Sequence, residues 1–355
     1  MTAPPEVVSP AEVEARFRDG AADVDGGSRD ARDGLRWLGE RDLIAPKDGG
    51  LPHTVALVEV IAGGCLSSAF SLWAHRMVVE YLRVGSPGGD SPALAAGLTE
   101  GTIVGSTAMA PALRDVAGLE PVPVTARRTA TGLVLDGPIR WASNLFDDAV
   151  MVLPARLPDG ADGPVSSDGA GRAVVRIRLS DPGVLPQRRP ELLALNGTAS
   201  GSVQLRDVEV PASAVLATDL GAFVRRIRPA FLLSQSAFCA GLAVRAAAEA
   251  GEHTGGANAV LAGDVRGVAE RAAAVHERLH AAAAGPDSVG PADLLRLRLD
   301  AASVAVAATR LEATVRGGAG YVAGSDVSRR LREAAFLPIQ APTEGQLRWE
   351  LSRFA

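Results

Sequence analysis

The chain has 355 residues, of which 47% are hydrophobic and 22% charged, and its formal net charge is −5. This length can bury two or three cores and favours a multidomain enzyme. The negative charge argues against nucleic acid as a partner, because phosphate binding requires a basic face. Two cysteines, Cys65 and Cys239, are too few for a disulfide framework and lack the spacing of a metal cluster, and we expect no metal.

The N-terminal stretch MTAPPEVVSPAEVEARF has neither a basic start nor an apolar core, so it does not read as a signal peptide. No uninterrupted apolar run approaches the ~20 residues that a membrane helix needs. We therefore expect a cytoplasmic protein with no membrane partner.

Residues 10 to 100 carry helical periodicity. Helices are predicted over Ala11–Phe17 and Asp30–Glu40, followed by a long apolar stretch from His53 to Leu82. This stretch is too apolar for a surface helix and should be packed on several sides. Gly63 and Gly64 predict a break within it.

Residues 101 to 217 change to short β-rich runs separated by turn signals such as Thr131-Gly132 and Asp136-Gly137-Pro138. The Gly/Asp/Ser-rich segment Pro158–Gly171 is predicted to be a hairpin loop. The predicted strands are Thr102–Ser106, Val122–Thr129, Leu133–Leu135, Ala149–Leu153, Ala173–Leu179 and Ser202–Leu205.

The rest of the chain returns to helix. Alanine-rich faces permit the close helix packing of bundles and oligomer cores, and glycines 317, 318 and 320 interrupt the pattern once. The order predicts an α+β protein with a helical domain at 1–100, a β domain at 101–218 and a helical bundle at 219–355. The predicted bundle helices are Ala222–Ala250, Val260–Ala284, Pro291–Arg316 and Asp326–Leu337.

Local sequence matches occur in the same order along the chain. Leu135–Asn144, which reads LDGPIRWASN, and Val203–Pro211, which reads VQLRDVEVP, fall in the β region. The bundle contains Arg228-Pro229, then GGAGY from Gly317, then LREA from Leu331. Together these matches resemble the acyl-CoA dehydrogenase family, whose members have an N-terminal helical domain, a middle β-barrel domain and a C-terminal four-helix bundle.

The resemblance implies a bound FAD. Trp141 and Ser143 stand where the family has its flavin-stacking Trp and the Thr that contacts N5 of the ring, and serine keeps the hydroxyl. The strand from Gly105 to Pro111 stands where backbone groups hold the ring. The implied cofactor-binding residues are Ser106, Met109, Trp141, Ser143, Gly317, Gly318, Gly320 and Thr343, and Arg228 is the implied substrate-binding residue.

The segment after the first bundle helix departs from the family. An Arg-x-x-Phe-Gly motif, whose Arg pairs with the pyrophosphate of a neighbouring subunit's flavin, is expected there, but Glu252–Asn258 reads EHTGGAN. Loss of that charge-assisted pair should weaken pyrophosphate binding by roughly 1.5–3 kcal/mol. Arg266 or helix-end amides are the substitutes that the sequence offers.

The family's catalytic glutamate is also missing. Its two known positions correspond to Ala341 and Ile227, and both are apolar. Glu344 is the nearest carboxylate, either as a shifted catalytic base or as a structural residue in the first turn of a helix. Glu80 and His75 are further candidates, although a single His on an apolar helix is usually a core residue.

Three functions fit these features. The first is a flavin-dependent oxidoreductase with non-standard chemistry, a dehydrogenase or a monooxygenase acting on an acyl thioester or a biosynthetic intermediate. The second is a degenerate, non-catalytic subunit of a hetero-oligomeric acyl-CoA dehydrogenase, and the third is a conventional dehydrogenase that uses Glu344. All three imply a small-molecule ligand and a homo- or hetero-oligomer, such as a dimer or tetramer.

Overall fold

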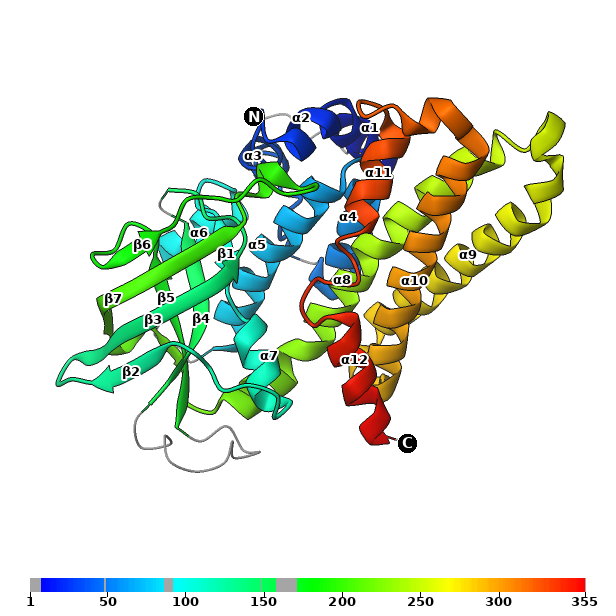
Figure 1. The fold of residues 1–355 in the computed structure, drawn as a ribbon. Helices are drawn as coiled ribbons and strands as arrows, with labels where there is room; N and C mark the ends of the chain where they lie inside the picture. The colour runs from blue at the N-terminus through cyan, green and yellow to red at the C-terminus, as the bar shows by residue number, and fades with distance from the viewer. Residues whose placement is uncertain (1–7, 48, 86–91, 148, 158–170, 355) are drawn as a thin grey trace.

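The computed structural model describes residues 8–47, 49–85, 92–147, 149–157 and 171–354. Figure 1 shows a β-sheet on one side, a C-terminal helical bundle on the other, and the long helices α5 and α8 between them. One continuous apolar core runs through all three parts, from Val13 to Leu347. The predicted hairpin loop at Pro158–Gly171 lies almost wholly outside the described residues.

The helical N-terminal region has the predicted break in its long apolar stretch, at Cys65. Cys65 is extended, with φ −152° and ψ 108°, and its Sγ accepts a hydrogen bond from the Ser68 N–H, which starts the next helix. At Gly64 an added Cβ would lie 2.6 Å from the Glu14 carbonyl oxygen, so α1 crosses there at close range. The helices are α1 (Pro10–Asp19), α2 (Ala21–Gly26), α3 (Arg32–Gly39), α4 (Gly50–Gly64), α5 (Leu66–Val84) and α6 (Pro92–Thr99).

The β region forms one eight-stranded sheet in the order β6-β7-β3-β2-β4-β5-β8, with β1 paired to β4 in parallel. The strands are β1 (Gly105–Thr107), β2 (Thr125–Arg128), β3 (Gly132–Ala142), β4 (Val150–Arg156), β5 (Arg172–Arg178), β6 (Val184–Pro186), β7 (Gly201–Pro211) and β8 (Val215–Ala217). The two longest strands, β3 and β7, pair with each other in antiparallel.

One predicted strand is wrong. The strand expected to continue to Pro111 ends at Thr107, and Ala110–Val116 forms the helix α7. Pro111 lies in the first turn of α7, where the missing N–H of proline leaves no helical hydrogen bond unmade.

The C-terminal region is a bundle whose longest member is α8 (Leu220–Gly251). This helix is long and apolar enough to cross a membrane, but 83% of its most apolar window is buried inside the protein, as in a core helix. Gly241 allows α8 to touch α4, since an added Cβ would lie 2.0 Å from the Glu59 carbonyl oxygen. The other helices are α9 (Ala262–Ala284), α10 (Pro291–Arg316), α11 (Asp326–Ala334) and α12 (Glu344–Leu351).

His75 connects the N-terminal helices to the sheet by hydrogen bonds. Its Nδ1 accepts a hydrogen bond from the Gly105 N–H at 3.0 Å, so Nε2 carries the proton and donates to the Leu98 carbonyl at 2.8 Å. The ring is fully buried between α5, α6 and β1, and desolvation lowers its pKa from 6.5 to about 4. His75 is therefore a neutral structural residue, and no described contact makes it a catalytic base.

The buried imidazole should make the protein less stable in acid. The unfolded chain binds a proton at His75 more readily than the folded chain, so its contribution is complete above pH 6.5 and is lost as the pH falls towards about 4. The loss amounts to at most about 3 kcal/mol of unfolding free energy. Urea unfolding across this pH range should show a shallower pH dependence for His75→Gln than for the wild type. Equal slopes in the two proteins would contradict the assignment.

Candidate functional site

A group of hydroxyl side chains lies where the end of β3 meets β1 and the turn before β7. Ser106 is fully buried and donates to the Ser143 carbonyl oxygen at 2.7 Å, so the structure brings these two predicted residues into direct contact. The Ser143 hydroxyl accepts a hydrogen bond from Ser200 Oγ at 2.9 Å. Among the described residues no acceptor takes the proton of Ser143, which leaves that proton free to donate to a ligand.

Asn144, the residue after Ser143, fixes the position of the chain that carries the Ser143 hydroxyl. It is fully buried, and its side-chain amide donates to the carbonyl oxygens of Ser71 and Gly105, each at 2.9 Å. Its Oδ1 accepts from the Ser71 hydroxyl at 2.6 Å. The backbone has φ +61°, a left-handed conformation that asparagine adopts more readily than most residues. Asn144 therefore joins the end of β3 to both α5 and β1.

Trp141 lies beside this group with an open ring. The β3–β7 register pairs Ile139 with Val203 and Ala142 with Gly201, so β3 carries one extra residue between these pairs. Such a bulge redirects side chains, and here both Arg140 and Trp141 face outward. The Trp141 side chain is 58% exposed, and it is the most exposed tryptophan among the large hydrophobic residues at the described surface.

Met109 lies on the protein side of the same region. It is the N-cap residue of α7, and its side chain is buried in the core. The Ala108 N–H donates to the Val152 carbonyl oxygen, which fixes the chain between β1 and α7 against β4. The segment from Ser106 to Met109 can therefore offer backbone groups to a ligand, but not the Met109 side chain.

The two positions that the sequence resemblance assigns to the family's base are occupied by apolar residues with structural contacts. Ile227 is fully buried in α8, and the Ala341 carbonyl oxygen accepts from Gln235 Nε2 at 2.9 Å. Behind this contact Arg298 is fully buried and donates to Gln235, Gln340 and the Leu337 carbonyl oxygen. All of these acceptors are neutral, so within the described residues the loop before α12 is fastened by a buried guanidinium that lacks a carboxylate partner.

Glu344 faces away from this loop. It is the first residue of α12, and its carboxylate pairs with Arg348 at 2.8 Å with both side chains partly exposed. Thr343 is the N-cap, and its hydroxyl accepts the Gln346 N–H. No described contact joins Glu344 or Thr343 to Ser143 or Trp141. Glu80, the remaining carboxylate candidate, is paired with Arg83.

Arg228 is not free to meet a substrate in this structure. Its guanidinium pairs with Glu350 of α12, and both side chains are mostly buried. Glu350 also accepts from Gln346, whose amide reaches the Leu113 carbonyl oxygen of α7. The contact links α8 through α12 to α7.

The predicted glycines lie in a turn at the far end of α10 from its start near α12 (Figure 1). A helix of that length spans ~39 Å, so within one chain these glycines are remote from the end of α10 that lies near α12. Gly317 has φ +55°, and an added Cβ at Gly317 or Gly318 would meet open space. Beside them Arg316 contacts His253, and no carboxylate of the described residues pairs with it.

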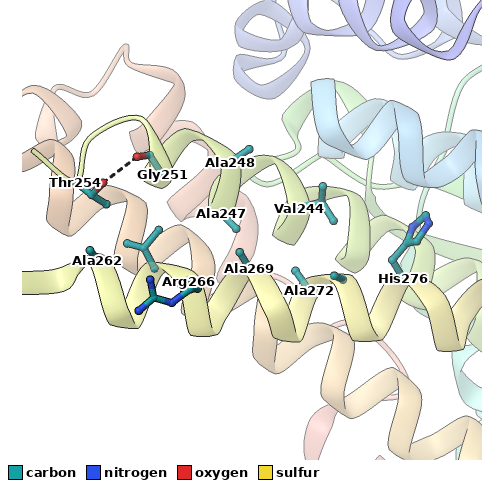
Figure 2. A pocket seen from close by; sticks show the side chains of 12 residues that line it. Val244, Ala247, Ala248, Gly251, Thr254, Ala262, Arg266, Ala269, Ala272 and His276 are labelled. Atoms are coloured by element: carbon teal, nitrogen blue, oxygen red, sulfur yellow. Dashed lines mark hydrogen bonds between the residues drawn. The ribbon is translucent and has the colours of Figure 1, made fainter. Parts of the chain in front are cut away.

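Two hollows in the described part of the chain are lined by neither Trp141 nor Ser143. The larger, of about 710 Å³, lies between α8 and α9 and is lined mainly by alanines, with Arg266 near one end and His276 at the other (Figure 2). The smaller, of about 390 Å³, lies where Leu193 of the β region faces Thr309 and Arg310 of α10 and Arg332 of α11.

Sequence reasoning missed three residues of this region. Asn144 was part of a recognised motif, but only its burial and φ show that it joins three elements. Arg298 and Arg316 are two of many arginines, and no local pattern separates them from surface charges. Their contacts with residues distant in sequence give them their importance.

Comparisons with solved structures find the same architecture over nearly the whole chain. Butyryl-CoA dehydrogenase from Megasphaera elsdenii matches with a TM-score of 0.82 and 16% identity, covering 99% of each chain. PigA, in a structure with FAD and proline, matches with a TM-score of 0.79 and 16% identity over 99% of this chain and 98% of that one. FkbI, described for biosynthesis of the methoxymalonyl extender unit of the Fk520 polyketide, matches with a TM-score of 0.80 and 20% identity over 97% and 98%.

No protein-family model matches the chain, and no curated protein sequence matches it. At identities of 20% or less these three similarities establish the fold alone. The arrangement of N-terminal helices, central sheet and C-terminal bundle, found over the full length of each relative, means that the chain has an acyl-CoA dehydrogenase-like fold.

Proposed function

We propose that the chain is a flavin-dependent oxidoreductase whose reaction does not use a carboxylate at the family's base positions. The observation that carries the proposal is the open Trp141 ring, two residues before Ser143, whose hydroxyl has a proton to donate. A flat heteroaromatic ligand needs both features, an apolar surface for its face and a hydrogen-bond donor at its edge. Both lie in the proposed β domain, residues 101–218, of a fold in which PigA is described with FAD.

In this proposal, residues of the β domain hold the ring of FAD. Trp141 would cover one face, Ser143 would hydrogen-bond to the ring edge, and backbone groups between Ser106 and Met109 would approach its polar side. When bound, a flavin supplies two-electron oxidation of a substrate or, once reduced, activation of dioxygen. Asn144 keeps Ser143 at a fixed position through its contacts with α5 and β1, so the donor does not have to be ordered on binding.

The apolar residues at Ala341 and Ile227 favour non-standard chemistry. Removal of an acidic α proton requires a base within hydrogen-bond reach of the substrate, and among the described residues Glu344 is turned to Arg348 instead. A reaction without that proton transfer, such as monooxygenation of a biosynthetic intermediate, agrees better with these positions. FkbI, one of the structural relatives, is described in polyketide biosynthesis.

The cation that the EHTGGAN segment lacks is supplied in this proposal by Arg316. This arginine contacts His253 of that segment, has no described carboxylate partner, and adjoins the open glycine turn. Because the turn lies at the far end of α10, Arg316 would meet the pyrophosphate of a flavin held mainly by a second subunit. The proposal therefore includes an oligomer, and two buried free thiols suit a reducing cytoplasm.

Replacing the open tryptophan should weaken flavin binding. Loss of ring stacking in Trp141→Ala is expected to cost about 0.5–1.5 kcal/mol or more, a 2- to 10-fold fall in affinity, with Trp141→Phe close to wild type. The measurement is the absorbance spectrum of the purified protein and titration of the stripped protein with FAD. A wild-type protein that is colourless and takes up no FAD alone, but becomes yellow with a co-expressed homologue, would favour the degenerate-subunit alternative.

Glu344 should not act as the base. Glu344→Gln is expected to retain the flavin content of the wild type and to lower the unfolding free energy by no more than about 1 kcal/mol through the helix dipole. Turnover with butyryl-CoA and an artificial electron acceptor should be the same in the variant and the wild type. Zero turnover in both proteins also meets this expectation. A fall of about 100-fold or more would make Glu344 a shifted general base.

Arg316 and Arg266 provide a matched pair for the pyrophosphate. Arg316→Ala is expected to reduce FAD affinity about 10-fold, because a hydrogen bond to a charged group contributes ~1.5–3 kcal/mol, whereas Arg266→Ala should retain it. The affinity for FAD should be compared with the affinity for riboflavin, a flavin without the pyrophosphate. The riboflavin affinity should be unchanged by both substitutions. Equal losses for riboflavin and FAD would indicate a general structural effect and remove Arg316 from the site.

A further inference from the structure

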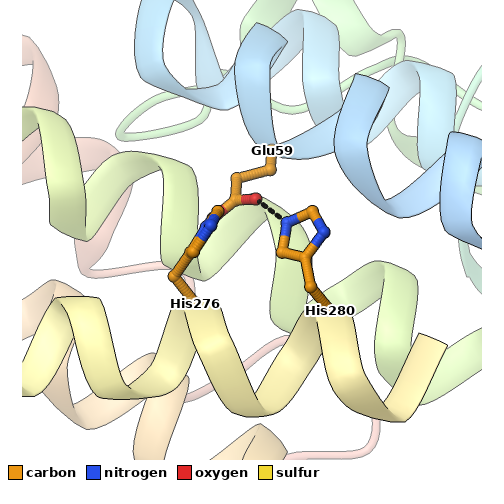
Figure 3. A group of neighbouring side chains, drawn as sticks. All are labelled: Glu59, His276 and His280. Carbon is orange, nitrogen blue, oxygen red and sulfur yellow. Dashed lines mark hydrogen bonds and ion pairs between the residues drawn. The ribbon is translucent and has the colours of Figure 1, made fainter. Parts of the chain in front are cut away.

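A carboxylate and two imidazoles meet between α4 and α9 (Figure 3). Glu59 Oε1 lies 2.8 Å from Nδ1 of His276, and Oε2 lies 2.6 Å from Nε2 of His280. The two histidines are four residues apart on α9, which places them on one face of the helix.

Glu59 is an unusual residue for its position. It is the only charged side chain of α4, whose other residues are almost all apolar, and its side chain is only 10% exposed. Burying a carboxylate is costly unless a positive charge compensates it. Among the described residues its side-chain partners are the two imidazoles, and no lysine or arginine pairs with it.

The three side chains can each direct one ligand atom at a common point. These atoms all lie within 4.8 Å of one another. Around a tetrahedral zinc ion, with bonds of about 2.0–2.2 Å, ligand atoms are about 3.3 Å apart. The two oxygen–nitrogen distances, 2.8 and 2.6 Å, would therefore have to open by about 0.5 and 0.7 Å on binding, which small side-chain rotations provide. His276 and His280 are 48% and 33% exposed, so an ion and a water ligand can approach from solvent.

We propose that Glu59, His276 and His280 bind one divalent transition-metal ion of the zinc type, with water completing the coordination. Two imidazole nitrogens and a single carboxylate suit Zn²⁺, Co²⁺ or Ni²⁺, whereas Mg²⁺ and Ca²⁺ prefer oxygen ligands only. Binding requires that Nδ1 of His276 and Nε2 of His280 carry no proton, so any proton there moves to the other nitrogen of a neutral ring or, from an imidazolium, to solvent. This site does not depend on the proposed flavin chemistry.

The ion would connect two parts of the chain. Glu59 belongs to the N-terminal helical region and the histidines to the bundle, so coordination cross-links the two. The expectation of no metal came from cysteine spacing and local patterns. His276 and His280 have a ligand-like spacing, but the third ligand is 217 residues from His276, and only the fold brings it near.

The test uses the full-length protein after treatment with a chelator. Calorimetric titration with Zn²⁺ should give one ion per chain with micromolar or tighter affinity, and Co²⁺ should produce visible d–d absorption. The melting temperature should rise by several degrees with Zn²⁺. His276→Gln and His280→Gln should each lower the affinity by about 100-fold or more, since even indirect partners of a metal are worth 10- to 100-fold.

His253→Gln is the matched control, because this histidine lies on the other end of the bundle and should leave Zn²⁺ binding intact. His276 is half exposed, so its substitution is not expected to prevent folding, and the metal-free melting curve checks this. The proposal is overturned if the wild type binds no stoichiometric Zn²⁺ at micromolar concentration. It is equally overturned if binding survives both His276→Gln and His280→Gln.

Discussion

The seam between sheet and helices depends on the buried amide of Asn144. Apolar packing brings α5, β1 and the end of β3 together, and this side chain adds hydrogen bonds to the backbone carbonyls of Ser71 and Gly105. An unpaired buried acceptor costs about 1–3 kcal/mol, so the bond to the Gly105 carbonyl favours this arrangement. By fixing the end of β3, Asn144 also fixes the hydroxyl of Ser143 and the bulge from which Trp141 emerges.

The sequence predicted well those elements whose stability is local. The helix over Pro291–Arg316 was predicted to the residue, and the break in the long apolar stretch within one residue of Gly64. The three-residue strands β6 and β8 were missed, because their existence depends on pairing with β7 and β5 and not on their own pattern. The site divides in the same way: motif order led to Ser106 and Ser143, while Arg298 and the Glu59 cluster required the three-dimensional structure.

The loop before α12 keeps its shape without a carboxylate at residue 341. Arg298 and Gln235 hold the loop by hydrogen bonds to backbone and amide oxygens, so no carboxylate is needed there for structure. The loop geometry and the catalytic group are thus physically separable. A chain under selection for a different reaction could change the residue at 341 while α12 kept its contacts with α7 and α8.

Gly241 has a consequence for modularity. The backbones of α4 and α8 are so close at this point that even one methyl group would collide with the Glu59 carbonyl. At this point α4 and α8 therefore meet at main-chain contact distance, with no layer of side chains between them. Recombination that exchanged the part containing α4 or the part containing α8 with a distant relative would place an unmatched surface at this close contact. This fold should therefore diversify by point substitution and loop change more readily than by exchange of its parts.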